Sequence, residues 1–361
     1  MKIVIDSVIY TPEGITKHAR EEAIHLRKAG HQIMLTDVNY NSFYDNEGIL
    51  FDCYTPIDFN KDEYIYYINQ PSIRHNNLSM SLLGQHHRKN IVYYLAFESL
   101  LPKEWVEVIN YVKPKLILTP SKYSMKLFRK SGINKKIPIK VLHHGTCTQF
   151  YEEHPKIHNN RFTFLWIGTG QNRRKNLKLL YDAWIKEFAN RDDVRLVVKM
   201  NPIYGINEEN QRMLNHLTQL DNVQIITDVL SDYNMKQLIH DSDCYISTSF
   251  SEGFGINILD AFSLGTPVIA TNAGGNMEFC NKKNCLLIES KKKFKVNEDV
   301  YQNIEWPEFK VNDLIKIMNK IIRNEKLIEK LTKQGLKTAR GYSWCKVGKT
   351  LEKYFQQVLK H

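Results

Sequence analysis

The sequence predicts an α/β protein made of two doubly wound domains, each a mostly parallel sheet with helices on both faces. The chain has 361 residues, a length that favours two domains. Short apolar, β-branched runs alternate with segments of helical periodicity, as is typical of parallel sheets. This alternation stops at a polar stretch, Thr148 to Arg161, and then starts again. We therefore expect an N-terminal domain over 1–155, joined by a final helix at about 345–361, and a C-terminal domain over 156–344.

The first domain opens with a strand, a loop, a helix and a second strand. Met1 to Tyr10 is an apolar, β-branched run, residues 16–28 carry apolar side chains at helical spacing, and Ala29-Gly30 ends this helix before a strand within 31–37. The further expected strands are 64–69, 91–96, 116–119 and 139–142, and the expected helices are 102–111 and 121–131.

The second domain repeats this alternation after the polar stretch, which we interpret as a linker because it has no periodicity. The expected strands are 162–167, 194–199, 223–226, 244–248 and 268–271, and the expected helices are 176–188, 208–220, 235–240 and 255–264. From Asp313 onward the chain is Lys-rich and helical, and Gly341–Phe355 predicts a turn and a last amphipathic helix. Since such domains bind ligands at the carboxyl ends of their strands, two of them facing each other predict an interdomain cleft.

Composition excludes several classes of protein. Apolar residues make up 42% of the chain and charged residues 25%, which is too apolar for a disordered protein. No run approaches the roughly 18 apolar residues of a membrane span, and the first residues lack a signal-peptide pattern, so we expect a cytoplasmic protein. The six cysteines are scattered without a C-x-x-C pair, which argues against a disulfide framework or a zinc site.

The net charge of +11 is concentrated in two tracts. Residues 281–361 hold 19 basic and 9 acidic residues, and Ser121–Lys140 holds seven basic residues and no acidic one. Solvated helix faces are the favoured interpretation of the C-terminal tract. Ser121–Lys140 fits peripheral contact with an anionic membrane better, because Met125, Leu127 and Phe128 interleave with its cations. No nucleic-acid partner is expected, because none of the usual binding motifs is present.

The segment from Ser247 to Thr271 is the most informative for function. A buried strand leads to Glu252, and Gly253-Phe254-Gly255 then opens a helix with Asp260 about one turn inside it. Glycines before a helix N-terminus allow a ligand to approach free backbone N–H groups, which favour an anion. From spacing alone, a loop acid and one solvated helix stripe explain the same pattern equally well.

The segment from Arg161 to Trp184 carries a second candidate site. A strand ends in Gly168-Thr169-Gly170, and three consecutive cations, Arg173, Arg174 and Lys175, precede the next helix. Fixed cations at the carboxyl end of a strand suit a diphosphate that gains charge as a sugar leaves. Taken alone, a solvated basic turn is the more common explanation of such a loop.

The two segments together resemble the family-4 retaining glycosyltransferases of the GT-B fold, also called glycosyltransferase group 1. Glu252, seven residues and then Asp260 match the family's pair of acids, although the second is usually glutamate. The resemblance implies that Glu252 contacts the donor sugar and Asp260 the nucleotide ribose. It also implies that the backbone of Gly253, Phe254, Gly255 and Ile256 receives the diphosphate. Gly274, Gly275 and Glu278 match the family's Gly-Gly-x-x-Glu stretch.

The basic loop resembles an Arg-Lys-Asn version of the family's phosphate loop. The resemblance gives Arg174 and Lys175 the diphosphate role and, with Glu252, makes them the candidate catalytic residues. Many members have an arginine at the position of Thr169, and Arg174 or Arg173 is the expected replacement.

The N-terminal half adds two candidates by the same resemblance. Gly14, in the first strand–helix loop, would let that loop approach the donor. Glu98 stands where many relatives have an acceptor-loop histidine and is a candidate acceptor or sugar contact, with a helix-capping acid as the alternative. His143 and His144 are expected to be structural, and residues 86–87 to lie at the surface.

Asp241 and Asp243, which are separated by one residue, have the D-x-D form of metal-dependent glycosyltransferases. They lie before a buried strand, at the end away from the expected cleft, and are interpreted as helix-stop and strand-entry acids. We therefore expect no metal cofactor.

The resemblance implies a retaining hexosyltransferase of glycan biosynthesis. It would use a UDP- or GDP-linked sugar and a glycan, lipid-linked or protein acceptor. Two alternatives stay open, a nucleotide-sugar epimerase of the GT-B fold and a non-catalytic subunit that binds a sugar nucleotide.

Overall fold

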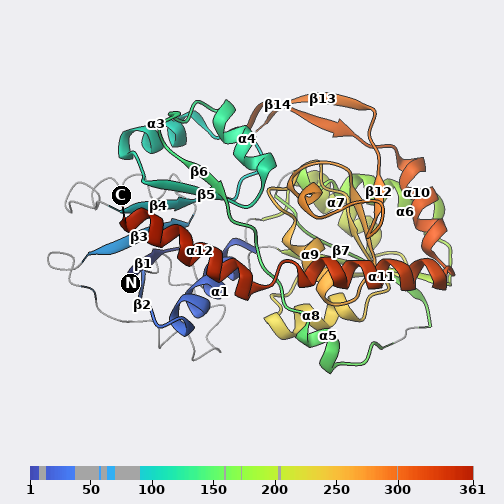
Figure 1. Ribbon diagram of the computed structural model, residues 1–361. Helices are drawn as coiled ribbons and strands as arrows, with labels where there is room; N and C mark the ends of the chain where they lie inside the picture. Colours follow the sequence, from blue (N-terminus) through green and yellow to red (C-terminus); the bar gives the residue numbers. More distant parts are fainter. Residues whose placement is uncertain are drawn as a thin grey trace. The chain divides into compact units, whose positions relative to one another are not determined.

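The computed structural model describes residues 1–7, 14–36, 57, 63–69, 90–157, 160–171, 173–201, 205–298 and 300–360 (Figure 1). The chain folds into two compact units. The first comprises Met1–Gly145, Asn297–Ile304 and Tyr342–His361, and the second comprises Thr146–Val296 and Glu305–Gly341. As in the predicted division, the last helix belongs to the first unit. Residues 146–155, predicted in the first domain, belong to the second unit, and residues 297–304, predicted in the second domain, belong to the first unit. The assignment of these units as functional domains stays a prediction.

The first unit contains a six-stranded parallel sheet in the order β2-β1-β3-β4-β5-β6. Its strands are β1 (Lys2–Asp6), β2 (Gln32–Thr36), β3 (Tyr64–Asn69), β4 (Ile91–Tyr94), β5 (Leu116–Thr119) and β6 (Ile139–Val141). The central strand β1 pairs on both edges, with Val4 opposite Met34 of β2 and Tyr66 of β3. The predicted strands of this half are confirmed to within a few residues at their ends.

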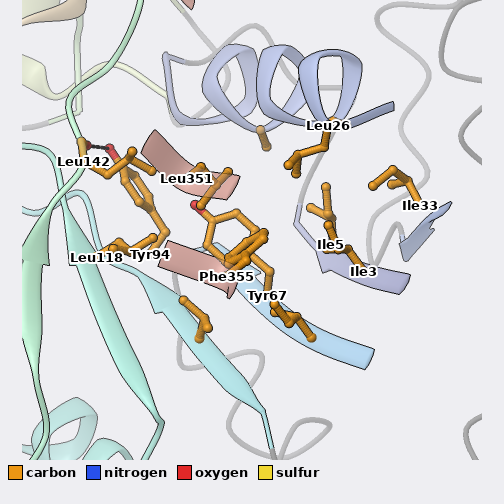
Figure 2. Packing of buried hydrophobic residues seen from close by; sticks show 14 of the residues in the cluster. Ile3, Ile5, Leu26, Ile33, Tyr67, Tyr94, Leu118, Leu142, Leu351 and Phe355 are labelled. Atoms are coloured by element: carbon orange, nitrogen blue, oxygen red, sulfur yellow. Dashed lines mark hydrogen bonds between the residues drawn. The ribbon is translucent and has the colours of Figure 1, made fainter. Parts of the chain in front are cut away.

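Helices cover both faces of this sheet. They are α1 (Gly14–Lys28), α3 (Lys103–Val112), α4 (Lys122–Lys130) and α12 (Trp344–Leu359). The last helix packs beside α1 although more than 300 residues separate them in sequence (Figure 1). Figure 2 shows Leu351 and Phe355 of α12 among the buried side chains of β1 and β3, and the Phe355 ring meets that of Tyr67 edge-on at 5.2 Å. The C-terminal helix therefore completes the core of the N-terminal sheet.

The second unit contains another six-stranded parallel sheet, in the order β12-β11-β10-β7-β8-β9. Its strands are β7 (Phe162–Thr169), β8 (Val194–Asn201), β9 (Val223–Ile226), β10 (Cys244–Ser247), β11 (Val268–Thr271) and β12 (Leu286–Ile288). Five of the eight residues of β8 are apolar and buried, and only Arg195 and Asn201 within this strand reach partial exposure. Nearly continuous apolar strands are the mark of a parallel sheet covered on both faces.

The helices of this unit lie in two layers. One layer contains α6 (Leu177–Glu187), α7 (Glu208–Leu217) and α10 (Val311–Ile321), and the other contains α8 (Asp232–His240), α9 (Ile256–Ser263) and α11 (Glu325–Arg340) (Figure 1). Side-chain caps mark where several of these helices begin. Asn207 accepts from the backbone N–H of Asn210 and Ser231 from that of Asn234.

Two sequence interpretations were wrong or incomplete. The predicted linker Thr148–Arg161 contains a short helix, α5 (Gln149–Glu153), because Phe150 packs its ring on His154 at 4.0 Å and is buried. The sequence interpretation also missed β12 and a two-stranded hairpin, β13 (Lys292–Glu298) and β14 (Tyr301–Glu308). The run of lysines at the start of β13 hides the strand pattern.

Among the described residues, no helix combines the length and the apolar character that crossing a bilayer requires.

Candidate functional site

The second sheet has a topological switch point between β7 and β10. These two strands are neighbours in the sheet but are separated by β8 and β9 in sequence. In doubly wound sheets, ligands bind outside the carboxyl ends of the strands at such a point. The loops that follow β7 and β10 are the two segments that the sequence analysis selected, the basic loop before α6 and the Glu252 loop before α9.

Glu252 brings these two loops together. Its Oε1 accepts a hydrogen bond from Lys175 Nζ at 2.6 Å, and its Oε2 accepts one from Arg174 Nη1 at 3.1 Å. Ser249 donates its hydroxyl to the same Oε1 at 2.6 Å. Only 12% of the Glu252 side chain is exposed, against 14% for Arg174 and 16% for Lys175. We call Arg174, Lys175, Ser249 and Glu252 the cationic cluster, because its formal charge is +1.

The surroundings keep Glu252 ionised. Burial alone would raise the pKa of this carboxyl, but the positive charges of Lys175 and Arg174 and the hydrogen bonds from Lys175 and Ser249 outweigh it. Together they lower the pKa of Glu252 from an ordinary 4.5 to about 2. At neutral pH the carboxylate therefore holds both cations in place while it shares their charge.

Backbone contacts hold the two loops in register. Phe250 donates its N–H to the carbonyl of Arg174 at 2.9 Å, and Arg174 also donates from Nη1 to the carbonyl of Ser251 at 2.9 Å. The Thr248 hydroxyl lies 3.0 Å from the carbonyl oxygen of Lys175. Asn176 adopts a left-handed conformation with φ 50°, which turns the chain from the basic loop into α6 and lets its side chain cap that helix.

The glycine pair Gly274-Gly275 contacts the backbone of Glu252. Gly275 donates its N–H to the carbonyl of Glu252. A Cβ atom on Gly274 would lie 2.6 Å from the backbone nitrogen of Glu252, and Gly274 has φ +85°, which side chains other than glycine rarely adopt. The Gly-Gly-x-x-Glu stretch therefore has a structural reason at its first position, Gly274, where only glycine allows this close approach.

The start of α9 presents backbone donors beside the cationic cluster. Gly255, with φ +90°, is its N-cap and offers no side-chain acceptor, and the first turn contains no acidic residue. Phe254 is buried with its ring 4.9 Å from that of Phe279, which fixes the Gly253–Gly255 turn. Ile256 is the first helical residue. The backbone N–H groups of a helix N-terminus and the helix dipole make this end suited to an anion.

Asp260 has partners other than a ligand in this structure. The Thr146 hydroxyl oxygen lies 3.0 Å from its Oδ1 and 2.8 Å from the hydroxyl of Ser263. Asp260 is 8% exposed. The carboxylate therefore interacts with the segment that enters the second unit, and the predicted ribose contact stays a prediction.

The other predicted site residues fall in two groups. Thr169 ends β7, and Arg173 is exposed at the start of the turn that contains Arg174 and Lys175, so both lie near the cationic cluster in sequence. Gly14 and Glu98 belong to the first unit, where Gly14 begins α1 and Glu98 follows β4. Glu98 is 9% exposed and accepts a hydrogen bond from the Tyr301 hydroxyl at 2.7 Å.

The D-x-D acids have structural roles. Asp243 accepts from the backbone N–H of Thr163 at 2.8 Å and donates its own N–H to the Thr163 carbonyl, at the amino end of β7. Asp241 accepts from the Gln237 side chain at 2.7 Å. Across the described ranges, no three acids, histidines or cysteines gather as metal ligands would.

One of the two histidines that the sequence predicts to be structural lies in the core of the first unit. His144 is buried, with Nε2 3.3 Å from the Tyr94 hydroxyl, and residues 86–87 lie outside the described residues. Within the basic tract, Phe128 points into the core at 0% exposure, whereas Lys122, Lys126 and Lys130 are exposed on α4.

Sequence reasoning missed the residues that orient the candidate ones. Ser249 binds Glu252 three residues later, and the Ser-x-x-Glu spacing was a usable signal. Thr248 and Thr146 act through contacts between segments 73 and 114 residues apart, which no local pattern in one sequence reveals.

Part of the chain is similar to known glycosyltransferases. Residues 161–302 match the family profile described as "Glycosyl transferases group 1". The chain is 26% identical over 170 residues to the GtfA subunit of the UDP-N-acetylglucosamine–peptide N-acetylglucosaminyltransferase of Streptococcus parasanguinis, over 42% of this chain and 32% of that one. It is 25% identical over 223 residues to the human alpha-1,3/1,6-mannosyltransferase ALG2, over 53% of each chain. The chain thus spans about a third and about half of the lengths of these two relatives.

A solved structure matches the whole chain. The Anabaena protein HepE, determined with UDP and glucose, superposes with a TM-score of 0.72 at 15% identity over 99% of this chain and 100% of that one. The chain therefore has the GT-B fold, with two doubly wound α/β units. The segment that contains the cationic cluster lies within the match to the glycosyl transferases group 1 profile.

Proposed function

We propose that the protein is a glycosyltransferase that moves a hexose-type sugar from a UDP- or GDP-linked donor to an acceptor hydroxyl. The observation that carries this proposal is the cationic cluster at the switch point of the second sheet. Arg174 and Lys175 are held 3.1 and 2.6 Å from the carboxylate of Glu252, in the loop that leads to the N-terminus of α9. A nucleoside diphosphate matches this pattern, because its charge can draw on both cations and on the helix N-terminus.

Within this proposal, each member of the cluster has a distinct role. The bond between the anomeric carbon and the diphosphate oxygen breaks, and Arg174 and Lys175 stabilise the charge that the leaving diphosphate gains. Glu252 loses part of its hold on the two cations to the diphosphate and can turn an oxygen toward hydroxyl groups of the sugar. The backbone of Gly253–Ile256 completes the phosphate contacts, and Asp260 binds the ribose after it releases Thr146.

We further propose transfer with retention of configuration and without a metal cofactor. The acceptor hydroxyl attacks from the side that the diphosphate leaves, and a phosphate oxygen of the donor takes its proton. Two fixed cations supply the charge stabilisation that a divalent ion gives other enzymes. Product configuration by nuclear magnetic resonance tests the first point. Activity in excess EDTA tests the second, and loss of activity that Mg²⁺ or Mn²⁺ restores would contradict it.

In this proposal the N-terminal unit binds the acceptor, with Glu98 as the candidate contact. Gly14 is the candidate residue of this unit for the donor. A glycan, a lipid-linked sugar or a protein would each present a hydroxyl. One relative is named as a subunit of a transferase that moves N-acetylglucosamine to a peptide, which supports a protein acceptor, and the other is named as a mannosyltransferase, which supports a hexose as the transferred sugar.

A panel of nucleotides and nucleotide sugars tests the donor. UDP, GDP, ADP and their sugars are added to the protein and the melting temperature is measured, because a bound ligand raises it by mass action. We expect one of the UDP or GDP ligands to raise it. Lys175→Ala is expected to remove that rise, and Glu252→Gln to keep nucleotide binding but abolish transfer. A rise that both variants keep, together with full activity, would contradict the assignment of the site.

The same panel separates the two alternatives. An epimerase would convert the sugar nucleotide without any acceptor, and a non-catalytic subunit would bind it without transfer to water or to any acceptor.

We also propose that α4 contacts an anionic membrane surface. Lys122, Lys126 and Lys130 are exposed on one short helix, and Lys135 and Lys136 follow it. Vesicles of phosphatidylcholine and phosphatidylglycerol are the probe, because anionic headgroups attract exposed lysines. The variant with alanine at the three helix positions is expected to sediment less with them than the unchanged protein does. Equal sedimentation of both proteins would refute membrane contact through α4.

A further inference from the structure

Lys199 is the most buried lysine in the part of the chain that the structure describes, and the proposed function does not use it. It is the sixth residue of β8 and is 4% exposed. Its ammonium group donates one hydrogen bond, to the carbonyl of Met200 at 3.1 Å. Burial lowers the pKa of Lys199, and the carboxylate of Asp228 offsets this lowering in part. A buried ammonium group that uses one of its three donors is costly, which makes it suited to a ligand that accepts hydrogen bonds.

The place of Lys199 in the sheet brings it to the candidate donor site. Strand β8 lies beside β7, and the loop that follows β7 supplies Arg174 and Lys175. Lys199 stands opposite Ile167, two residues before the paired strand ends Thr169 and Asn201. Its hydrogen bond to the next residue along the strand turns the ammonium group toward this carboxyl edge. Ligands of doubly wound sheets bind at that edge.

The alternation of β8 decides on which face of the sheet Lys199 lies. Phe164 of β7 contacts the ring of Trp184 in α6, and Phe164 pairs in register with Leu196 of β8. Because successive side chains of a strand point to opposite faces, Leu196 lies on the α6 face and Lys199, three residues later, lies on the other. That other face is covered by the layer that contains α8 and α9. It is therefore the face whose helix α9 carries the candidate ribose contact, Asp260.

The packing around Glu252 indicates on which side of the cationic cluster a nucleobase fits. Toward β11, a Cβ atom on Gly274 would already lie 2.6 Å from the backbone nitrogen of Glu252, so no space is left there for a flat ring. On the opposite side of the switch point, the sheet continues from β7 to β8 and β9. Lys199 lies on this side.

We propose that Lys199 contacts the nucleobase of the donor and selects uracil or guanine over adenine. This inference rests on the proposed function, because a diphosphate at the cationic cluster fixes where the nucleoside begins. An ammonium group only donates hydrogen bonds. Uracil and guanine carry carbonyl oxygens that accept them, whereas the exocyclic group of adenine is an amino group, which is itself a donor. Lys199 thus makes the site specific for a base with a carbonyl oxygen.

Calorimetric titration of UDP, GDP, ADP and inorganic pyrophosphate into Lys199→Met tests this inference. Methionine keeps an unbranched apolar side chain at the buried position, so the melting temperature should not fall. In the unchanged protein, UDP or GDP should bind at least about tenfold more tightly than ADP, and Lys199→Met should weaken this ligand about tenfold or more. ADP and pyrophosphate should stay within about twofold, because their contacts to the cationic cluster are unchanged.

Arg195→Met is the matched control. Arg195 lies on the same strand and the same face, four residues toward the amino end, where its guanidinium donates to the Gln224 side chain of β9. The change removes one positive charge from β8 as Lys199→Met does, but at the end of the strand away from the candidate site. It should leave all four affinities within about twofold.

The outcomes separate this inference from the proposed function. Equal weakening of all four ligands in Lys199→Met would assign Lys199 to the phosphates or to the fold, and would overturn the inference. Unchanged affinity of this variant for UDP and GDP, or binding of ADP as tight as theirs to the unchanged protein, would overturn it as well but would leave the proposed donor site standing. Absence of binding of every nucleotide and of pyrophosphate to the unchanged protein would refute the proposed function itself.

Discussion

Replacement of Glu252 by glutamine tests whether the carboxylate is ionised inside the cationic cluster. The pKa of this group is lowered to about 2 from an ordinary 4.5. A group whose pKa is lower in the folded than in the unfolded protein stabilises the fold at high pH. This stabilisation is complete above about pH 4.5 and is lost as the pH falls through about 2.

The size of the effect follows from the shift. One pKa unit corresponds to about 1.4 kcal/mol, so the ionised carboxylate contributes about 3 kcal/mol to the free energy of unfolding at pH 7 and about 1 kcal/mol at pH 3. Glu252→Gln should therefore unfold at a lower urea concentration at pH 7, and its deficit should shrink by about 2 kcal/mol between pH 7 and pH 3.

Urea unfolding at both pH values, followed by tryptophan fluorescence, measures this difference, since Trp166, Trp184 and Trp306 belong to the second unit and are buried. Glu289→Gln is the matched control, because Glu289 is 48% exposed, its lysine partner at 3.4 Å is 82% exposed, and its hydrogen bond from Asn272 also lies at the surface. Its deficit should stay below about 0.5 kcal/mol at either pH. A deficit of Glu252→Gln that is absent, or equal at pH 7 and pH 3, would refute the ionised cluster.

Three further predictions concern the support of the site. Gly274→Ala should weaken UDP binding at least about tenfold, because a Cβ atom at this position would meet the Glu252 backbone. Gly30→Ala is the control and should leave binding unchanged, because Gly30 has a similar φ of +84° but nothing within 4 Å of its Cβ position. Calorimetric titration measures both affinities, and equal values would contradict the role of Gly274. Thr146→Val should lower the free energy of unfolding by about 1–3 kcal/mol, because Asp260 loses a buried partner; urea unfolding without any change would show that this contact is dispensable. Asp243→Ala should lower the free energy of unfolding by a similar amount, about 1–3 kcal/mol, because its hydrogen bond from Thr163 is lost. The affinity of this variant for UDP should stay within about twofold of that of the unchanged protein, with or without Mg²⁺. If the unchanged protein bound UDP more tightly with Mg²⁺ and the variant did not, Asp243 would be a metal ligand.

The pattern of the sequence predicts most of the fold because parallel strands are short and nearly uniformly apolar. The expected strands 64–69, 116–119, 223–226 and 268–271 match the observed bounds. The hairpin escaped because its exposed lysines at 292, 293 and 295 follow no clear alternation, and its burial depends on Phe97 and Phe250, which are distant in sequence.

The candidate site was predictable only in part. The spacing of Glu252 and of the basic loop along the chain selects two segments that lie in contact, because both follow strands that end at one sheet edge. The pairing of Glu252 with two cations depends on the strand order, in which β10 lies beside β7. The contact between Asp260 and Thr146 depends on where the chain enters the second unit, and no spacing along the sequence encodes it.

Calorimetric titration of UDP into Lys175→Met and into Lys178→Met tests most directly whether the cationic cluster receives a diphosphate. Each change removes one lysine charge, and the two lysines lie three residues apart. Lys175 pairs with Glu252 and its side chain is 16% exposed, whereas Lys178 pairs with Asp182 and its side chain is 56% exposed. We predict that Kd for UDP rises about tenfold or more in the first variant, as expected for a lost charged hydrogen bond, and stays within about twofold in the second. Equal affinity of the two variants and the unchanged protein, in a protein that binds UDP, would contradict the account.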